Sequence, residues 1–371
     1  MKKDDAPVRL LQSINKNKKF SGLWRSIDEY RDRERNNWPA WCFLPLNIWH
    51  ILMVIAEQKF VQKNDPTTLG IINSFSAVLA AIGSWRPTQD IFIFDNEAFE
   101  AIAKSDIDAK ISVENILHLP AWSIYIKWGK HDYDGFFATL IYEAGESKKY
   151  LDLVFLYDND CNFPKPNFVR IPLQKSLSVY EAINSYKQEN IKKQKKIGIN
   201  SALTEEYFDE ININDVAVAV SLILYICSES PEIDGITATA TISHPRSQKI
   251  KNGWRIFPPE NPKIHVVAEK IGYNLRKYKS KTQIELSNQK MPPHIRRGHF
   301  TRYWYGPRNS PHRCYDFRWI PPLPTKKQEE TTKAETLKQV KVTGAKNIKK
   351  KSVKVTWKKV AKAKSYQIQY A

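Results

Sequence analysis

The sequence lacks the patterns that mark several common protein classes. Four cysteines lie far apart and form no CxxC pair, which argues against a disulfide framework or a structural zinc site. No apolar run reaches the roughly eighteen residues of a membrane span, and the first twenty residues lack the apolar stretch of a secretory signal. We therefore expect a cytoplasmic protein with no membrane partner.

Motifs for common enzyme chemistry are also missing. The chain contains no GxGxxG or GxxxxGK[ST] phosphate loop, no GxSxG nucleophile elbow and no HExxH pair. The acidic stretches at 132–134 and 158–160 resemble metal-binding loops but have no matching third carboxylate, so turns are favoured there. We therefore expect no cofactor and no metal site.

Positive charge is abundant but unevenly placed. Lysine and arginine exceed aspartate and glutamate by 19. Residues 326–371 hold 14 lysines and three glutamates, a net charge of +11, which leaves +8 for the other 325 residues. Since the main body is only moderately basic, the total charge is weak support for a nucleic-acid partner.

Apolar periodicity predicts an α+β fold, with mixed helices packed on one side of a largely antiparallel sheet. Ser178 and Glu181 have the spacing of a capping box, in which each side chain bonds the other's backbone N–H. In chain order the predicted elements are helices at 48–61 and 69–82, a strand at 91–94, a helix at 96–105, strands at 122–126, 136–143 and 150–157, and helices starting at 178, at 215–229 and at 263–279.

Composition divides the chain into four parts. We predict a charged leader at 1–35 that is loose or helical with little core of its own, an α+β body at 36–325 with a sub-boundary near 165–178, and a linker at 326–339. Residues 340–371 look like the start of a fibronectin type III-like repeat, an incomplete β-sandwich tail. Its three expected strands are VKV (340–342), SVKVTW (352–357) and SYQIQY (365–370).

A C-terminal β-hairpin at 299–320 is the strongest candidate site, because aromatic and polar residues alternate along both predicted strands. Arginines beside tyrosine and tryptophan can grip phosphates and stack on bases, and they also dominate protein-binding hot spots. The alternative is a purely structural role, in which the aromatic side chains pack in the core and the arginines form ion pairs or lie in solvent. The candidate partner- or nucleic-acid-binding residues are His294, Arg296, Arg297, His299, Arg302, Tyr303, Trp304, Arg308, Arg318 and Trp319.

The blocks PHIRRGHFTRYWYG (293–306) and FRWIPP (317–322) resemble the C-terminal signature of a family found in bacteria and mobile genetic elements. This family includes a type V-A anti-CRISPR protein that suppresses production of the single-protein type V-A nuclease. The resemblance covers about residues 36–322. Further blocks in the family's order are GSWRPTQDIFIFD (83–95), LPAWSIYI (119–126), YLDLVFLYDND (150–160), SLSVYEAI (176–183) and GWRIFPPENPKIHVVAEKIGYNLRKY (253–278).

The resemblance implies a binding protein of phage–host defence that acts in the bacterial cytoplasm and is not an enzyme. The family supplies no catalytic residue that can be assigned in this sequence. It implies that the partner is the N-terminal peptide of the nascent nuclease, and that binding lowers nuclease mRNA and protein in a translation-coupled way. The mRNA or the ribosome is a further candidate partner. The sequence departs from the family at Phe300, where tryptophan is common, and in continuing past the usual end of the pattern into 326–371.

Two other classes stay open on the sequence alone. An RNA-binding regulator or a ribonuclease could use His294 and His299, since paired histidines beside arginines are the groups that acid–base cleavage of RNA needs. The sequence supplies no matched carboxylate or lysine to complete such a site. A surface-attached adhesion protein rests only on the fibronectin-like tail.

Overall fold

The structure is a computed structural model of the whole chain. It describes residues 5–56, 66–107, 111–128, 133–157, 167–174, 177–185, 213–286, 295–308, 313–324, 342–349 and 352–357. The chain divides into two compact units, Met1–Pro324 and Thr325–Ala371, and each is described by itself.

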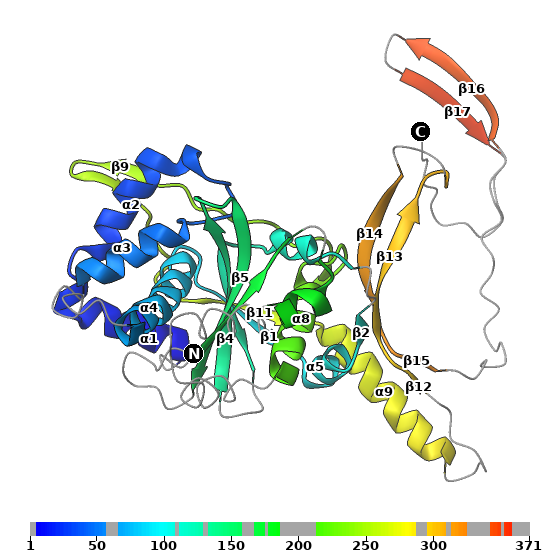
Figure 1. Cartoon of the computed structure of the whole chain (residues 1–371). Helices are drawn as coiled ribbons and strands as arrows, with labels where there is room; N and C mark the ends of the chain where they lie inside the picture. The colour runs from blue at the N-terminus through cyan, green and yellow to red at the C-terminus, as the bar shows by residue number, and fades with distance from the viewer. Residues whose placement is uncertain are drawn as a thin grey trace. The chain divides into compact units, whose positions relative to one another are not determined.

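The first unit combines helices with a large sheet and a separate hairpin (Figure 1). Its helices are α1 (Ala6–Lys16), η1 (Lys18–Phe20), α2 (Leu23–Glu34), η2 (Arg35–Asn37), α3 (Leu46–Ala56), α4 (Pro66–Trp85), α5 (Asn96–Ala103), η3 (Val113–His118), a helical stretch at 179–185, α8 (Ile213–Ile226) and α9 (Glu269–Leu286). Its strands are β1 (Asp90–Phe94), β2 (Asp106–Ile107), β3 (Ser123–Lys127), β4 (Tyr133–Glu143), β5 (Lys148–Tyr157), β6 (Asn167–Pro172), β7 (Glu232–Ile233), β8 (Ile236–Thr237), β9 (Gln248–Ile250), β10 (Gly253–Arg255), β11 (Lys263–Val267), β12 (Ile295–Arg296), β13 (His299–Tyr305), β14 (Cys314–Ile320) and β15 (Leu323–Pro324).

The main sheet has eight strands in the order β6-β5-β4-β3-β1-β11-β7-β8. Only the β3–β1 and β1–β11 pairs are parallel; the other neighbours are antiparallel. The predicted α+β class with a largely antiparallel sheet is confirmed. Most predicted helices and strands are also present, although the residues at 57–61 and beyond 185 in the corresponding predicted helices lie outside the described ranges.

Helices cover both faces of this sheet, so the expectation of helices on one side is wrong. Helices α1 to α4 pack on one face and α5 with α8 on the other (Figure 1). Neighbouring residues of a strand therefore enter different cores, as Phe136 and Phe137 do in β4. This explains why the central strands are apolar at nearly every position instead of alternating.

The charged N-terminal segment contributes side chains to the core between helices α1–α4 and the sheet. Leu10 and Ile14 of α1 and Ile27 of α2 are almost fully buried beside residues of α3 and α4. Asp28 is buried with them and forms an ion pair with Arg86 at the end of α4. The leader expected at 1–35 is thus helical over most of its length and packs its apolar residues against the rest of the unit.

Two local predictions have contrasting outcomes. The capping box is confirmed, because Ser178 N donates to Glu181 Oε2 at 2.8 Å and Glu181 N donates to Ser178 Oγ at 3.3 Å. The helix predicted at 263–279 is wrong in its first part, where β11 pairs with β1 and α9 begins only at Glu269. β-Branched residues in 263–267 suit a central strand, and Ala268 makes the turn with a φ of 59°.

The second unit contains one described antiparallel hairpin, β16 (Val342–Lys349) with β17 (Ser352–Trp357). Strand β17 coincides with the predicted SVKVTW strand. Strand β16 begins where the predicted VKV strand at 340–342 ends, and the expected strand at 365–370 lies outside the described residues. In the part of the chain that the structure describes, no helix is long and apolar enough to cross a membrane.

Candidate functional site

The predicted hairpin is confirmed and is built from β13 and β14. The structure adds its register, which is antiparallel and runs from His299–Ile320 to Tyr305–Cys314. β13 also pairs with β2, so the hairpin is the outer part of a three-stranded sheet. In this register the side chains of directly opposed residues share a face. Trp304 therefore lies on the same face as Tyr315, and Tyr303 lies on the same face as Asp316.

The base of the hairpin is anchored in the core. Phe300 and Phe317 are 1% and 2% exposed and stack at 5.6 Å between ring centroids. The Trp319 indole donates to Ser105 Oγ at 2.8 Å, and Glu229 N donates to the Phe317 carbonyl at 2.9 Å. The hairpin therefore projects from the body on a rigid base, which holds its outer residues in place.

The outer half of one face, which we call the arginine face, consists of Arg302, Trp304, Arg313 and Tyr315. The Arg313 guanidinium lies 4.7 Å from the centroid of the Trp304 ring, and that of Arg302 lies 5.3 Å from it. Arg302 is also 5.4 Å from the Tyr315 ring, and the two rings are 5.0 Å apart. The two rings are tilted by 55° to each other, and cation–π attraction to the guanidinium groups holds these four side chains as one cluster.

The opposite side, which we call the paired face, consists of Tyr303, Tyr305, Asp316 and Arg318. Arg318 Nη2 donates to Asp316 Oδ2 at 2.6 Å and to Tyr305 Oη at 2.7 Å, and its guanidinium lies 5.5 Å from the Tyr303 ring. Hydrogen bonds from Tyr305 and Arg318 lower the pKa of Asp316. The positive charge of Arg318 is thus balanced by a carboxylate, unlike the charges of the arginine face.

The structure separates the ten predicted site residues. Arg302 and Trp304 come together on one face, and Tyr303 and Arg318 on the other. Trp319 is buried and belongs to the anchor. The remaining residues are placed as follows: His299 half-buried at the base, Arg308 exposed beyond β13, Arg297 exposed before β13, and His294 and the side chain of Arg296 outside the described residues.

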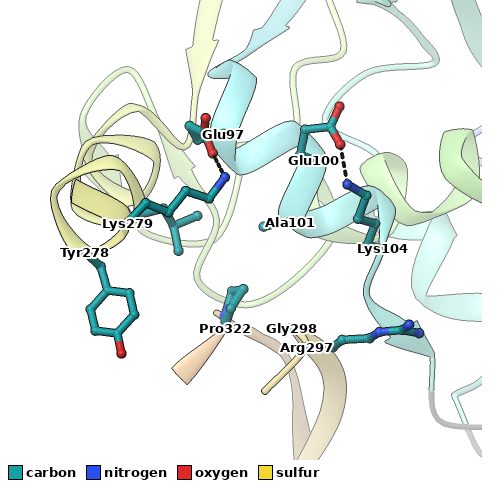
Figure 2. A pocket seen from close by; sticks show the side chains of 10 residues that line it. Glu97, Glu100, Ala101, Lys104, Tyr278, Lys279, Arg297, Gly298 and Pro322 are labelled. Carbon is teal, nitrogen blue, oxygen red and sulfur yellow. Dashed lines mark hydrogen bonds and ion pairs between the residues drawn. The ribbon is translucent and has the colours of Figure 1, made fainter. Parts of the chain in front are cut away.

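A cleft of about 240 Å³ lies where the hairpin meets α5 and α9 (Figure 2). Arg297 lies at this cleft and not on either face of the hairpin. Two ion pairs flank the cleft: Lys279 with Glu97, and Lys104 with Glu100 at 2.8 Å. The lining residues are Glu97, Glu100, Ala101, Lys104, Leu275, Tyr278, Lys279, Arg297, Gly298 and Pro322.

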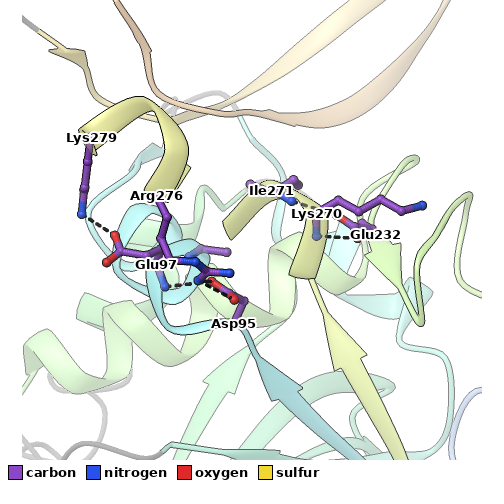
Figure 3. A network of polar contacts seen from close by, with 8 residues as sticks. Asp95, Glu97, Glu232, Lys270, Ile271, Arg276 and Lys279 are labelled. Atoms are coloured by element: carbon purple, nitrogen blue, oxygen red, sulfur yellow. Dashed lines mark hydrogen bonds and ion pairs between the residues drawn. The ribbon is translucent and has the colours of Figure 1, made fainter. Parts of the chain in front are cut away.

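Sequence reasoning missed a polar network at the end of β1 (Figure 3). Asp95 Oδ1 accepts from Glu97 N at 3.0 Å at the start of α5, and Arg276 Nη1 of α9 lies 2.8 Å from both Asp95 oxygens. Glu232 is 2% exposed and bonds two backbone N–H groups in the first turn of α9. The oxygens of both carboxylates accept hydrogen bonds from protein groups, so we assign the network a structural role.

A second missed cluster surrounds His265 in β11. Its Nδ1 lies 2.8 Å from Asp234 Oδ2 and its Nε2 lies 3.1 Å from Asp90 Oδ1, while its ring stacks on Phe92 at 4.7 Å. Burial lowers the pKa of His265, but the hydrogen bonds with the two aspartates outweigh it, so the pKa is raised above 6.5. The folded state therefore favours the imidazolium form.

This cluster predicts a pH dependence of stability. A histidine whose pKa is raised on folding stabilises the folded state fully below its unfolded pKa, and this stabilisation is lost as pH rises through the folded pKa. We expect the free energy of unfolding to fall from pH 6 upward, and the fall to be smaller in His265→Gln, which cannot titrate. Urea unfolding across this pH range measures both. Equal slopes for the two proteins would contradict the assignment.

Among the described residues, no group of three histidine, cysteine or acidic side chains could hold a metal ion. The fold and site thus define an α+β protein that presents a two-faced aromatic and arginine hairpin. The sequence model of the AcrVA2-like family, described as "Anti-CRISPR type V subtype A2 family", matches residues 92–327. This is more than half of the chain, and the chain belongs to this family, which confirms the resemblance inferred from the sequence.

One solved structure, described as "Crystal structure of AcrVA2", is similar to this chain with a TM-score of 0.59 and 20% sequence identity. The similarity covers 85% of this chain and 98% of the other. At this level of identity the likeness shows the fold alone. No curated protein matches the sequence.

Proposed function

We propose that this protein inhibits a type V-A CRISPR system by binding the N-terminal peptide of the nascent nuclease, and that binding lowers the level of nuclease mRNA and protein. Membership of the anti-CRISPR family supports the target system. The observation that supports a binding role for the hairpin is the exposure of three consecutive aromatic residues, Tyr303, Trp304 and Tyr305, at 45%, 44% and 42%.

Exposed aromatic residues on a rigid base suit peptide recognition. Rings with few rotatable bonds lose little conformational entropy on contact, and tyrosine, tryptophan and arginine are enriched at binding hot spots. On the paired face, the charge of Arg318 is neutralised by Asp316. We assign the peptide contact to Tyr303 and Tyr305 of this face, because a neutral aromatic surface accepts a peptide without leaving a buried unpaired charge.

Retention of ribosome–nascent-chain complexes tests this proposal. The full-length protein is immobilised and offered ribosomes that display either the nuclease N-terminal peptide or an unrelated peptide of equal length. We expect retention only with the nuclease peptide, and at least a tenfold loss in the variant Tyr303→Ala/Tyr305→Ala, because truncation of a hot-spot residue typically removes more than about 1.4 kcal/mol. Equal retention of both complexes would overturn the peptide assignment.

We also propose that the protein binds its target and catalyses no reaction. His299 is half-buried at the base of the hairpin, and the ribonuclease alternative uses it with His294. Purified protein incubated with naked RNA is expected to leave the RNA intact. Cleavage that disappears in His294→Ala or His299→Ala would show instead that the hairpin base is a nuclease site.

A further inference from the structure

We propose that the arginine face of the hairpin binds single-stranded RNA. This inference goes beyond peptide recognition and assigns a separate ligand to Arg302, Trp304, Arg313 and Tyr315. It depends on the charge and ring geometry of this face alone, and it can hold whether or not the nascent peptide binds the paired face.

The charge balance of the hairpin supports an anionic ligand. Residues 299–320 contain four arginines and a single carboxylate, Asp316. That carboxylate lies on the paired face and forms an ion pair with Arg318. Within the described part of the chain neither Arg302 nor Arg313 forms an ion pair with a carboxylate, and the sequence from 306 to 313 contains no acidic residue. The arginine face therefore carries two positive charges without local neutralisation.

The combination of arginines and aromatic rings on this face favours nucleic acid over other anions. A guanidinium group beside an aromatic ring supplies N–H donors for phosphate oxygens, and both guanidinium and aromatic planes can stack on unpaired bases. Trp304 keeps 44% of its surface exposed beside the arginines. The carboxylates of an acidic peptide could pair with the two arginines. They could not also stack on the Trp304 and Tyr315 rings, as a base can.

The same geometry distinguishes single strands from duplexes. The bases of a duplex are stacked on each other, and the major groove of A-form RNA is too deep and narrow for side chains to read. Splayed bases of a single strand present their faces to aromatic side chains, with stacking worth roughly 1–3 kcal/mol per base. The arginine face can therefore bind single-stranded RNA by stacking on its bases but gains little from contact with a duplex.

Fluorescence anisotropy with a short labelled oligouridine tests the inference, using the full-length protein and single-site variants. We expect Trp304→Ala to weaken binding about tenfold. Tyr303→Ala is the matched control, since Tyr303 is equally exposed but lies on the paired face, and it is expected to bind like the wild type. The lysine-rich segment 326–371 is present in every variant, so its non-specific attraction for RNA cancels in these comparisons.

Salt dependence tests the role of the arginines. For single strands the slope of log K against log salt concentration changes by about 0.7 for each phosphate contact, so Arg302→Ala/Arg313→Ala should reduce the slope by about 1.4. Trp304→Phe keeps a ring and should retain most of the affinity. If Trp304→Ala lowers the thermal unfolding midpoint, its weaker binding could come from unfolding. The Trp304→Phe and Arg302→Ala/Arg313→Ala variants then test whether the arginine face binds RNA.

Three results would overturn the inference: equal affinities for Trp304→Ala and Tyr303→Ala, an unchanged salt slope in the arginine variant, or competition by polyglutamate as strong as that by unlabelled oligouridine. The last would indicate a general surface for acidic polymers. If the protein binds oligouridine but does not retain ribosomes in a peptide-dependent way, the proposed function is overturned and the RNA-binding inference stands. The two proposals are therefore tested separately.

Discussion

Replacing Asp28 by alanine is expected to lower the free energy of unfolding by about 3–5 kcal/mol. The Asp28 and Arg86 side chains are only 1% and 6% exposed and form an ion pair. Asp28 Oδ2 also accepts a hydrogen bond from Ile256 N at 3.1 Å. Removing the carboxylate leaves the Arg86 charge buried without a counter-ion and the backbone N–H of Ile256 without a partner, and both losses destabilise the folded state.

The double variant Asp28→Leu/Arg86→Met is the control for this prediction. Because it removes both charges and fills their space with apolar groups, it should recover much of the stability that Asp28→Ala loses. Chemical denaturation of the three proteins gives the comparison. If Asp28→Ala loses less than about 1 kcal/mol, the pair behaves like an exposed salt bridge, and α2 is not held to α4 in the way described.

Phe317→Ala is expected to destabilise the protein by about 3–5 kcal/mol and to abolish the proposed peptide and RNA binding by the hairpin. Phe317 is 2% exposed and stacks on Phe300, so its loss leaves a cavity where the hairpin enters the core. Without this anchor the outer residues of both faces lose their fixed positions. The stability loss is measured by denaturation, and the binding losses by nascent-chain retention and oligouridine anisotropy.

Tyr303→Ala provides the matched comparison, since Tyr303 is 45% exposed and its truncation opens no core cavity. We expect it to change the free energy of unfolding by less than about 1 kcal/mol while weakening peptide retention. A Phe317→Ala protein that is as stable as the wild type and still binds both ligands would show that the hairpin does not depend on this anchor.

Alternation along the sequence was sufficient to predict the hairpin and its two faces. Period-2 patterns report the face of each residue within a strand, and they correctly separated Phe300 from Tyr303. They do not report the depth of a residue, which depends on where the hairpin enters the body. Trp319 and Trp304 share a face, yet one is anchored to Ser105 in the core and the other is exposed.

Other features depend on contacts between distant parts of the chain. The arginine face includes Arg313 and Tyr315 because the strand register brings them to Trp304. Sequence reasoning included neither in the site, because it predicted the two strands without their register. Asp95 and Arg276 are 181 positions apart, and only the folded structure brings them together.

The error at 263–267 has a similar cause. Val266, Val267 and Ile271 have a spacing that a helix also satisfies, and short apolar runs are ambiguous by periodicity alone. Pairing of β11 with the central strand β1 decides in favour of the strand. The same central position explains the buried His265, which faces two aspartates supplied by other elements of the sheet.

The most direct test of the proposed function is a pair of reporter genes in a bacterial host that expresses this protein. One reporter carries the first codons of the type V-A nuclease in frame. The other carries nearly the same nucleotides with one base inserted at the start and one deleted at the end of this segment, so that its encoded peptide changes but the reporter stays in frame. We predict that reporter mRNA falls for the in-frame gene alone. An equal fall for both genes would contradict recognition of the nascent peptide.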